Sequence, residues 1–380
     1  MEKRRISVAA PVLNGNEKQY VMDCLESTWI SSTGKYIKRF EDAFADFCQV
    51  KHAVSCSNGT TALHLALMAL GVGPGDEVIV PTLTFVATAN AVTFCGARPV
   101  FVDAQPDTWN IDPRLVEDKF TPRTKGIIVV HLFGHPVDMD PIMSLARRHG
   151  LFVIEDAAQA HGAEYKGKKV GSISDVATFS FYGNKIVSTG EGGMVVTDDD
   201  AIADKINLLK NHGMDPNRRY WHPVIGYNYR LTNVAAAIGL AQLEKVDWQL
   251  KRRQEVVSWY REFLGSVEGL GFQSEKEWAK HVWWMFSVVP AARGSRSRDA
   301  IMRQLQDEGI ETRPVVVPIH QLPPYVDSVR GQNFPVADLI SRNGINLPTW
   351  AGLTRDDVSY VCNQFLRCLE KESSVHKASS

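Results

Sequence analysis

One lysine of the sequence stands where a charged side chain is costly. Lys185 follows the apolar, aromatic run Ala177–Tyr182 and Gly183, and a second apolar run begins at Met194 after small polar residues and glycines. Burying an ammonium group costs free energy, so a lysine in such a place loses its proton readily. The neutral amine is a nucleophile that forms imines with aldehydes. A lysine in an exposed loop is the common alternative, and only the rest of the chain decides between the two.

A short polar turn earlier in the chain has the composition of an anion-binding site. Ser57–Thr61 lies between an expected strand at 53–56 and an expected helix at 62–70. A strand, a small polar turn and a helix together present free backbone N–H groups and the positive end of a helix dipole. The hydroxyl groups of Thr60 and Thr61 add further donors. The alternative is an ordinary helix cap, for which Ser, Asn and Thr are the usual residues.

Other polar and aromatic residues follow expected strands in the same way. Short apolar segments alternate with helical ones, which indicates an α/β fold with a mostly parallel sheet. Ligands of such folds bind beyond the carboxyl ends of the strands. The residues expected at that edge are Ser57–Thr61, Phe85, His131, Asp156, Gln159 and Lys185. We therefore treat them as one candidate site.

Composition restricts the class of protein. The 380 residues are 44% hydrophobic and 22% charged, and the net charge of −1 gives no electrostatic reason to bind nucleic acid or an anionic membrane. No apolar run is long enough to span a bilayer, and no apolar stretch follows the basic residues near the N-terminus as in a secretory signal. The six cysteines lack the spacing of a zinc site. We therefore expect reduced thiols, a cytoplasmic protein and no bound metal.

The expected elements divide the chain into two domains. We place the boundary near residue 245, where an apolar helix gives way to the charged run Lys251–Arg253, so that a large domain covers 1–245 and a smaller one 246–380. A helix is expected over 82–90, with Phe85 near its start, and a long one over 233–254. Neither a G-x-G-x-x-G fingerprint after an early strand nor a G-x-x-x-x-G-K-[ST] motif occurs, which disfavours a classical dinucleotide site.

The candidate residues match the needs of one kind of cofactor. An aldehyde cofactor with a basic ring nitrogen and a phosphate needs an amine, a carboxylate that keeps the ring nitrogen protonated, an anion cradle and a flat apolar partner. Lys185 can supply the amine, and Asp156 the carboxylate. The cradle and the ring partner can come from Gly59, Thr60, Ser180 and Phe85. Each residue alone has an ordinary structural explanation, but together they indicate a site for such a cofactor.

The sequence closely resembles the pyridoxal-phosphate sugar aminotransferases of the DegT/DnrJ/EryC1/StrS family, from about Ile6 to about Leu366. The resemblance is carried by Ser57–Leu63, Glu155–Ala160, Phe179–Lys185, Gly190–Gly193 and Gly226–Asn233. It implies the fold-type I architecture of aspartate aminotransferase, pyridoxal phosphate as cofactor and a homodimer. Dehydratase relatives have histidine at the position of Lys185, so the lysine favours transamination.

The resemblance also implies a role for each matching residue. Lys185 would bond covalently to the cofactor, Asp156 would pair with its ring nitrogen, and Gln159 would contact the region of the ring hydroxyl. Asn228 would reach the cofactor phosphate held by the other subunit, so that two subunits share each site. The residues expected to bind the phosphate and stack on the ring are Ser180, Gly59, Thr60 and Phe85.

The resemblance points to substrates as well. L-glutamate is the expected amino donor, and the acceptor would be a nucleotide-linked 4-keto-6-deoxy sugar that receives the amine at C4. Segments at 28–32, 214–221, 311–315 and 344–348 are most similar to family members that use GDP-4-keto-6-deoxymannose. The candidate contacts of the sugar and the nucleotide are Trp29, Ser31, His131, His161, Arg313 and His320. For each of them, a place in the protein core is the alternative.

Three other functions stay open at this point. The acceptor sugar could be linked to dTDP or UDP. The same cofactor could serve a dehydratase or another lyase without transamination, which Lys185 disfavours. A non-catalytic regulator built on this fold would normally carry a DNA-binding appendage or lack the lysine, and the sequence shows neither.

Overall fold

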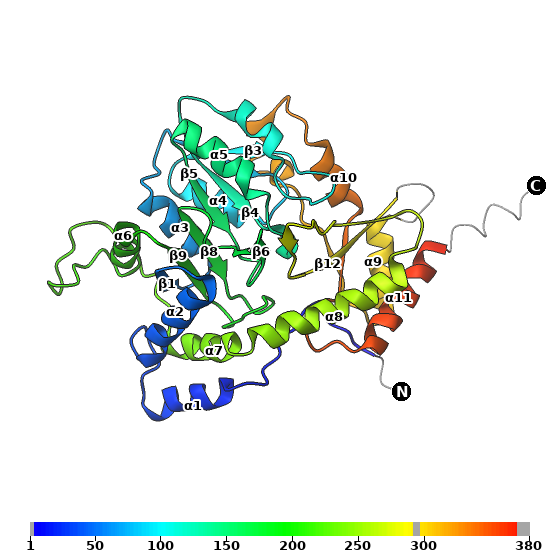
Figure 1. The fold of residues 1–380 in the computed structure, drawn as a ribbon, viewed down its shortest axis with the longest axis horizontal. Helices are drawn as coiled ribbons and strands as arrows, with labels where there is room; N and C mark the ends of the chain where they lie inside the picture. The colour runs from blue at the N-terminus through cyan, green and yellow to red at the C-terminus, as the bar shows by residue number, and fades with distance from the viewer. Residues whose placement is uncertain (1–3, 292–296, 371–380) are drawn as a thin grey trace, which may run out of the picture.

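The computed structural model describes residues 4–291 and 297–370, and Figure 1 shows their arrangement. Its α-helices are α1 (Glu17–Glu26), α2 (Lys35–Cys48), α3 (Gly59–Ala69), α4 (Ala87–Phe94), α5 (Met139–His149), α6 (Asp200–Lys210), α7 (Asn233–Leu243), α8 (Val246–Leu264), α9 (Arg298–Asp307), α10 (Pro335–Asn343) and α11 (Arg355–Glu370). None of the described helices combines the length and the apolar composition that crossing a bilayer requires.

A seven-stranded sheet forms the centre of the fold, with strand order β1-β9-β8-β5-β4-β2-β3. Its strands are β1 (His52–Cys56), β2 (Glu77–Pro81), β3 (Arg98–Val102), β4 (Thr124–Val130), β5 (Phe152–Asp156), β8 (Val176–Ser180) and β9 (Gly193–Thr197). The pairs from β3 through β2, β4 and β5 to β8 are parallel, and β9 is antiparallel to both of its neighbours. The prediction of an α/β fold with a mostly parallel sheet is confirmed.

The large sheet is buried on both faces, which explains why its strands are continuously apolar. Along β4, Ile128 packs with residues of α3 and α4 on one face, while Ile127 and Val129 pack with residues of α5 on the other. Near the other edge, Phe179 and Met194 pack with α2 and α7. This alternation follows from the two-residue period of a strand, so neighbouring side chains enter different helical layers.

Parallel strands place their carboxyl ends at one edge of the sheet. The residues that follow β2, β4 and β5, and those at the end of β8, therefore share this edge, as the sequence predicted for its candidate site. The predicted helix over 82–90 begins later, at Ala87, so Phe85 lies in the loop before α4 and not inside the helix.

A second sheet lies beside the first and has the order β10-β12-β14-β13. Its strands are β10 (Leu270–Phe272), β12 (Phe286–Pro290), β13 (Arg313–Pro314) and β14 (Ile345–Leu347), and a small third sheet joins β11 (Ala279–Lys280), β6 (Glu164–Tyr165) and β7 (Lys168–Lys169). In Figure 1, α8 runs along the lower side from the large sheet to the second one.

The prediction of one long helix over 233–254 is wrong, because the chain forms two helices there. α7 ends at Leu243 and α8 runs from Val246 to Leu264. The break lets α7 pack against α1 and α2 while α8 packs against α11. The division of the chain into domains at 1–245 and 246–380 stays a prediction.

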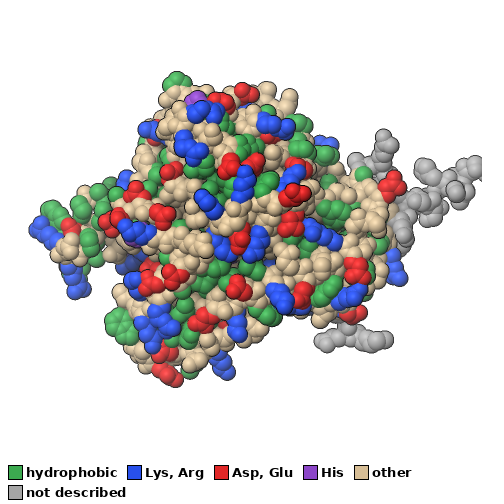
Figure 2. All heavy atoms as spheres, in the orientation of Figure 1, with side chains coloured by type: hydrophobic (Ala, Val, Ile, Leu, Met, Phe, Trp, Pro, Cys, Tyr) green, Lys and Arg blue, Asp and Glu red, His purple; other side chains and the backbone are tan. Residues whose placement is uncertain are grey.

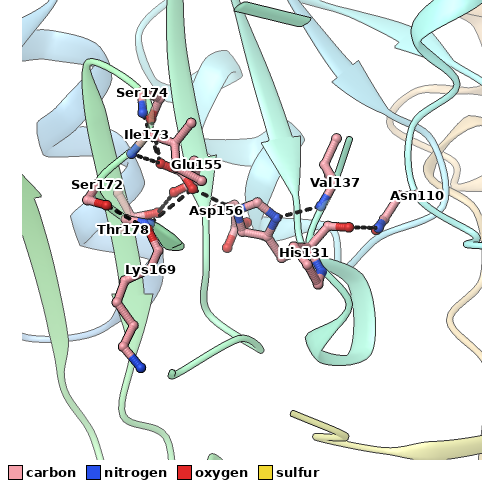
Figure 3. Close-up of polar contacts among 12 residues, drawn as sticks. Asn110, His131, Val137, Glu155, Asp156, Lys169, Ser172, Ile173, Ser174 and Thr178 are labelled. Carbon is pink, nitrogen blue, oxygen red and sulfur yellow. Dashed lines mark hydrogen bonds and ion pairs between the residues drawn. The ribbon is translucent and has the colours of Figure 1, made fainter. Parts of the chain in front are cut away.

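A buried carboxylate ties the strand ends together next to the candidate site (Figure 3). Glu155, in β5, lies 3.0 Å from His131 Nε2 and accepts hydrogen bonds from the backbone N–H groups of Gly171, Ile173 and Ser174 at 3.0–3.1 Å. Burial alone would raise the pKa of this carboxyl, but the hydrogen bonds from His131 and the N–H groups hold it below its ordinary value. Glu155 therefore stabilises the fold as a carboxylate.

Replacing Glu155 by glutamine should test this. The amide of glutamine would turn its own N–H groups toward the N–H donors that now bond to the carboxylate of Glu155. We therefore expect a loss of about 3 kcal/mol in the free energy of unfolding. Urea denaturation near neutral pH is the measurement. Because the native pKa is lowered, the contribution is present above the unfolded pKa and lost as the pH falls through the native one. Glu117→Gln, in an exposed ion pair with Arg148, is the control. Equal small effects of both changes would contradict this account.

Candidate functional site

Lys185 lies in the loop between β8 and β9 with its amine inside the site. Its Nζ is 3.9 Å from the ring centroid of Trp284, and its backbone N–H donates to Tyr182 O at 2.8 Å. No carboxylate of the described residues lies within ion-pair distance of Nζ. Burial lowers the pKa of the amine to about 8, with Asp156 acting in the opposite direction and Arg313 in the same one. The amine is therefore available as a neutral nucleophile near neutral pH.

Asp156 ends β5 and is buried. Thr88 Oγ1 donates to its Oδ2 at 2.8 Å, and the N–H of Ala158 donates to its Oδ1 at 3.2 Å. Burial raises the pKa of this carboxyl in spite of these hydrogen bonds. A cationic N–H group placed against it would favour the charged form, so the site suits a protonated ring nitrogen.

The turn before α3 caps the helix and leaves backbone N–H groups free. Asn58 caps the helix, because its Oδ1 accepts from the N–H of Thr61 at 2.9 Å while Thr61 Oγ1 accepts from the N–H of Asn58 at 3.1 Å. Among the described residues, none accepts a hydrogen bond from the N–H groups of Gly59 and Thr60. The expected cap is thus present, and it leaves two donors at the positive end of the helix for an anion.

Ser180 and the start of α3 approach so closely that only glycine fits at position 59. A Cβ on Gly59 would lie 2.7 Å from Ser180 Cβ. This approach brings the hydroxyl of Ser180, at the end of β8, beside the free N–H groups of the helix. The sequence therefore places three donors around one point, which is the arrangement that a phosphate requires.

Gln159 and Phe85 each have a group that a ligand could contact. The N–H of Phe133 donates to Gln159 Oε1 at 2.7 Å, which leaves the amide NH2 as the end free to donate. Phe85 is 60% exposed in the loop after β2, an unusual position for a phenyl ring that nothing covers. Both side chains are thus available to a flat, polar ligand.

His131 does not have the role predicted for it. Its ring is wholly buried, with Nε2 near Glu155, and its Nδ1 accepts from the N–H of Val137 at 3.0 Å. Both ring nitrogens are therefore used inside the protein, and His131 holds the end of β4 rather than a substrate.

His161 and His320 are also buried side chains. The ring of His161 is wholly buried among Phe44, Phe179 and Phe181, and burial lowers its pKa to about 3, so it is a neutral core residue. The ring nitrogens of His320 lie 2.7 Å from Thr82 Oγ1 and 3.0 Å from Asp338 Oδ1. His320 therefore uses both ring nitrogens inside the protein, whereas His161 lies close enough to Lys185 for that charge to lower its pKa, and its contact with the sugar stays a prediction.

Trp29 and Ser31 lie in an exposed loop that one buried side chain fixes. Asn233, at the start of α7, donates from Nδ2 to Trp29 O at 2.6 Å and accepts at Oδ1 from the N–H of Tyr36 at 3.0 Å, while its own N–H donates to Ser31 O at 2.6 Å. A cavity of about 430 Å³ opens beside Trp29 and Asn233. Trp29 therefore faces open space, and the contact of Trp29 and Ser31 with the sugar nucleotide stays a prediction.

Asn228 belongs to a segment between α6 and α7 that projects from the body of the molecule, at the left of Figure 1. Its side chain is exposed, and its Oδ1 accepts from Arg230 Nε at 3.1 Å. The projecting tip carries apolar and basic side chains, visible at the left of Figure 2. Asn228 is thus on a surface that another subunit could reach.

The sequence analysis missed two residues that contact the site. Thr88, in α4, binds Asp156, and Trp284, just before β12, lies against Lys185. Thr88 comes soon after Phe85, in a segment that was expected to follow a strand, and this position could have marked Thr88 as a candidate residue of the site. Trp284 comes from a distant part of the chain, and no local pattern indicated its contact.

The site fits pyridoxal phosphate on these observations. Among the described residues, the amine of Lys185 has no ion-pair partner, the buried Asp156 has no cation at ion-pair distance, and the N–H groups of Gly59 and Thr60 have no acceptor. An imine-forming aldehyde, a ring nitrogen and a phosphate would satisfy these three groups in turn.

Comparisons with known proteins agree with this fit. A model of the DegT/DnrJ/EryC1/StrS aminotransferase family matches residues 11–366. The GDP-perosamine synthase of Caulobacter vibrioides is 55% identical over 361 residues, covering 94% of this chain and 96% of that protein. S. venezuelae DesV, solved in complex with a ketimine intermediate, has a TM-score of 0.86 at 38% identity, covering 92% of this chain and 93% of DesV. Helicobacter pylori PseC, an aminotransferase involved in the biosynthesis of pseudoaminic acid, has a TM-score of 0.91 at 28% identity, covering 97% of this chain and 100% of PseC.

A family match over most of the length, a relative of high identity and solved structures of the same architecture all point the same way. This chain belongs to the DegT/DnrJ/EryC1/StrS family and is a pyridoxal-phosphate-dependent sugar aminotransferase of fold type I.

Proposed function

We propose that this aminotransferase moves the amino group of L-glutamate to C4 of GDP-4-keto-6-deoxymannose and so makes GDP-perosamine for O-antigen or another surface polysaccharide. The observation that carries the choice of sugar is the similarity to GDP-perosamine synthase over nearly the whole chain. The presence of Lys185, in place of the histidine of dehydratase relatives, supports transfer of the amine over dehydration.

In this proposal each binding residue holds one part of the cofactor. When bound, pyridoxal phosphate supplies an electron-accepting ring and a carbonyl carbon that takes up the amino group. Asp156 would keep the proton on the ring nitrogen, and Gln159 would donate its amide N–H to the ring hydroxyl. The phosphate and the ring face would be held by Gly59, Thr60, Ser180 and Phe85.

Lys185 has the properties of the group that moves the proton. With a pKa of about 8, its Nζ exists in both protonation states near neutral pH. Nζ can therefore accept a proton from the carbon of the amino donor and release it again, which is the requirement for general acid–base catalysis. The positive charge of Arg313, close enough to lower the pKa of Lys185, suits an anionic group of either substrate. Trp29 and Ser31 would face the sugar nucleotide.

The choice of sugar is tested with a panel of acceptors. We expect the purified protein, given L-glutamate and GDP-, dTDP- or UDP-linked 4-keto-6-deoxy sugars, to form an amino sugar from the GDP-linked one at least about tenfold faster. Mass spectrometry of the sugar nucleotide and an assay for 2-oxoglutarate are the measurements.

Two lysine variants control this panel. Lys185→Ala should lose at least about a hundredfold in rate because it removes the acid–base group, whereas Lys168→Ala, in β7 and exposed, should leave the rate unchanged. A preference for dTDP- or UDP-linked sugar would contradict the proposed substrate. Consumption of sugar without 2-oxoglutarate would indicate a dehydratase.

We propose further that the protein is a homodimer with shared active sites, in which Asn228 reaches the cofactor phosphate of the other subunit. The exposed apolar side chains support this, since Ile225 is 90% exposed and Tyr220 75% exposed on the projecting segment. Large apolar side chains left in water at such a tip are typical of a surface that another chain covers. Asn228 lies on the same segment.

Mixing two inactive variants should test the sharing of sites. Lys185→Ala disables one half of a site, and Asn228→Asp places a negative charge against the phosphate of the other half. A mixed dimer would contain one intact site, so random exchange of subunits should restore roughly a quarter of wild-type activity. The activity of the mixture after exchange, compared with that of each variant alone, is the measurement. Absence of recovery in dimers shown by mass to be mixed would contradict shared sites.

A further inference from the structure

The indole ring of Trp284 contacts the amine of Lys185. The indole ring lies with its face toward Nζ, 3.9 Å from the ring centroid, well inside the distance at which a cation is attracted by an aromatic ring. Tryptophan is the strongest aromatic partner for an ammonium group. No other aromatic ring of the described residues makes such a contact with Lys185.

The ring of Trp284 is held in place from several sides. Its Nε1–H donates to Asn184 O at 2.9 Å, next to Lys185 in the chain, and its backbone N–H donates to Phe133 O at 2.8 Å. Arg253 Nη1 donates to Trp284 O at 3.1 Å, and the Phe133 ring stacks on the indole with centroids 6.2 Å apart. A ring fixed by these contacts has a defined orientation at little further entropic cost.

The backbone around this contact is strained in a way that orients the ring. Phe133 and Trp283 both have left-handed φ angles, 55° and 52°, which are rare for bulky residues. Phe133 in this conformation donates its N–H to Gln159 and accepts from Trp284. Strain of this kind persists where the surroundings enforce it, and it is frequent at functional sites.

We propose that Trp284 is a positioning residue for Lys185, whose indole face holds the side-chain amine whenever that amine is not bonded to the cofactor. This inference rests on the proposed role of Lys185. Released from the cofactor, the amine must stay within reach to move a proton and to bond again. A face that attracts its charged form, and not a carboxylate that would bind it tightly, keeps it near and free to react.

The charge balance around Nζ makes the effect of the ring measurable. Burial lowers the pKa of Lys185, Asp156 raises it and Arg313 lowers it. His161 is neutral because burial and the charges of Lys185 and Arg253 lower its pKa to about 3. An aromatic face adds stabilisation of the ammonium form only, so removing it should lower the pKa of the amine.

The test measures that pKa directly. The full-length protein is loaded with pyridoxamine phosphate, which leaves the Lys185 amine unbonded, and is trace-labelled with acetic anhydride from about pH 6 to about pH 10 before peptide mass spectrometry. Trp284→Leu should move the labelling midpoint of Lys185 down by about one pH unit, and Trp284→Phe by less, because phenylalanine keeps a weaker face. Trp350→Leu, in a tryptophan bound to Ser7 O, is the control and should not move it.

The outcomes separate this inference from the proposed function. The inference is overturned if the labelling midpoint of Lys185 in Trp284→Leu is unchanged or higher. If Trp284→Leu does not fold, the inference is overturned by a Trp284→Phe midpoint equal to that of Trp350→Leu. Failure of the proposed function would appear instead as absence of amino sugar with the wild-type protein. The labelling midpoint does not depend on either substrate.

Discussion

The site depends on keeping one amine inside the protein without a bound carboxylate. An isolated ammonium in such a place is costly, and the cost appears as the lowered pKa of Lys185. The surroundings balance this cost. Asp156 supplies a negative charge at the end of β5, and Trp284 supplies an aromatic face against Nζ. Had the amine an ion-pair partner, it would be held as a cation and would react slowly with a carbonyl.

The large sheet meets this constraint by its topology. Parallel strands end at one edge, so turns far apart in sequence bring an amine, a carboxylate and a set of N–H donors to one place. Helix layers on both faces bury the strands that carry these turns. Glu155 and His131 act beside the site, where their hydrogen bonds fix the loop after β4 and the segment before β8. Buried polar groups of this kind are stable only when each has its partner.

The site residues whose positions could be predicted from the sequence are those that lie at strand ends. Gly59, Asp156, Ser180 and Lys185 follow or end apolar strands, and strand ends can be recognised from residue pattern alone. The histidines could not be assigned in this way. His131 and His161 have the expected position in the chain, but packing decides whether a ring faces a cavity or the core. Trp284 was missed for the same reason, since its contact with Lys185 depends on how the second sheet meets the first. The break between α7 and α8 also arises from tertiary packing, because both segments are good helix formers.

If the amine of Lys185 carries the cofactor, chemical reduction should fix the cofactor to this residue. The purified protein is reduced with borohydride, which converts an imine to a stable amine, and is then digested for peptide mass spectrometry. We expect the reduced pyridoxal phosphate adduct on the peptide that contains Lys185. A protein that binds the cofactor but carries the adduct on another lysine, or on none, would contradict it.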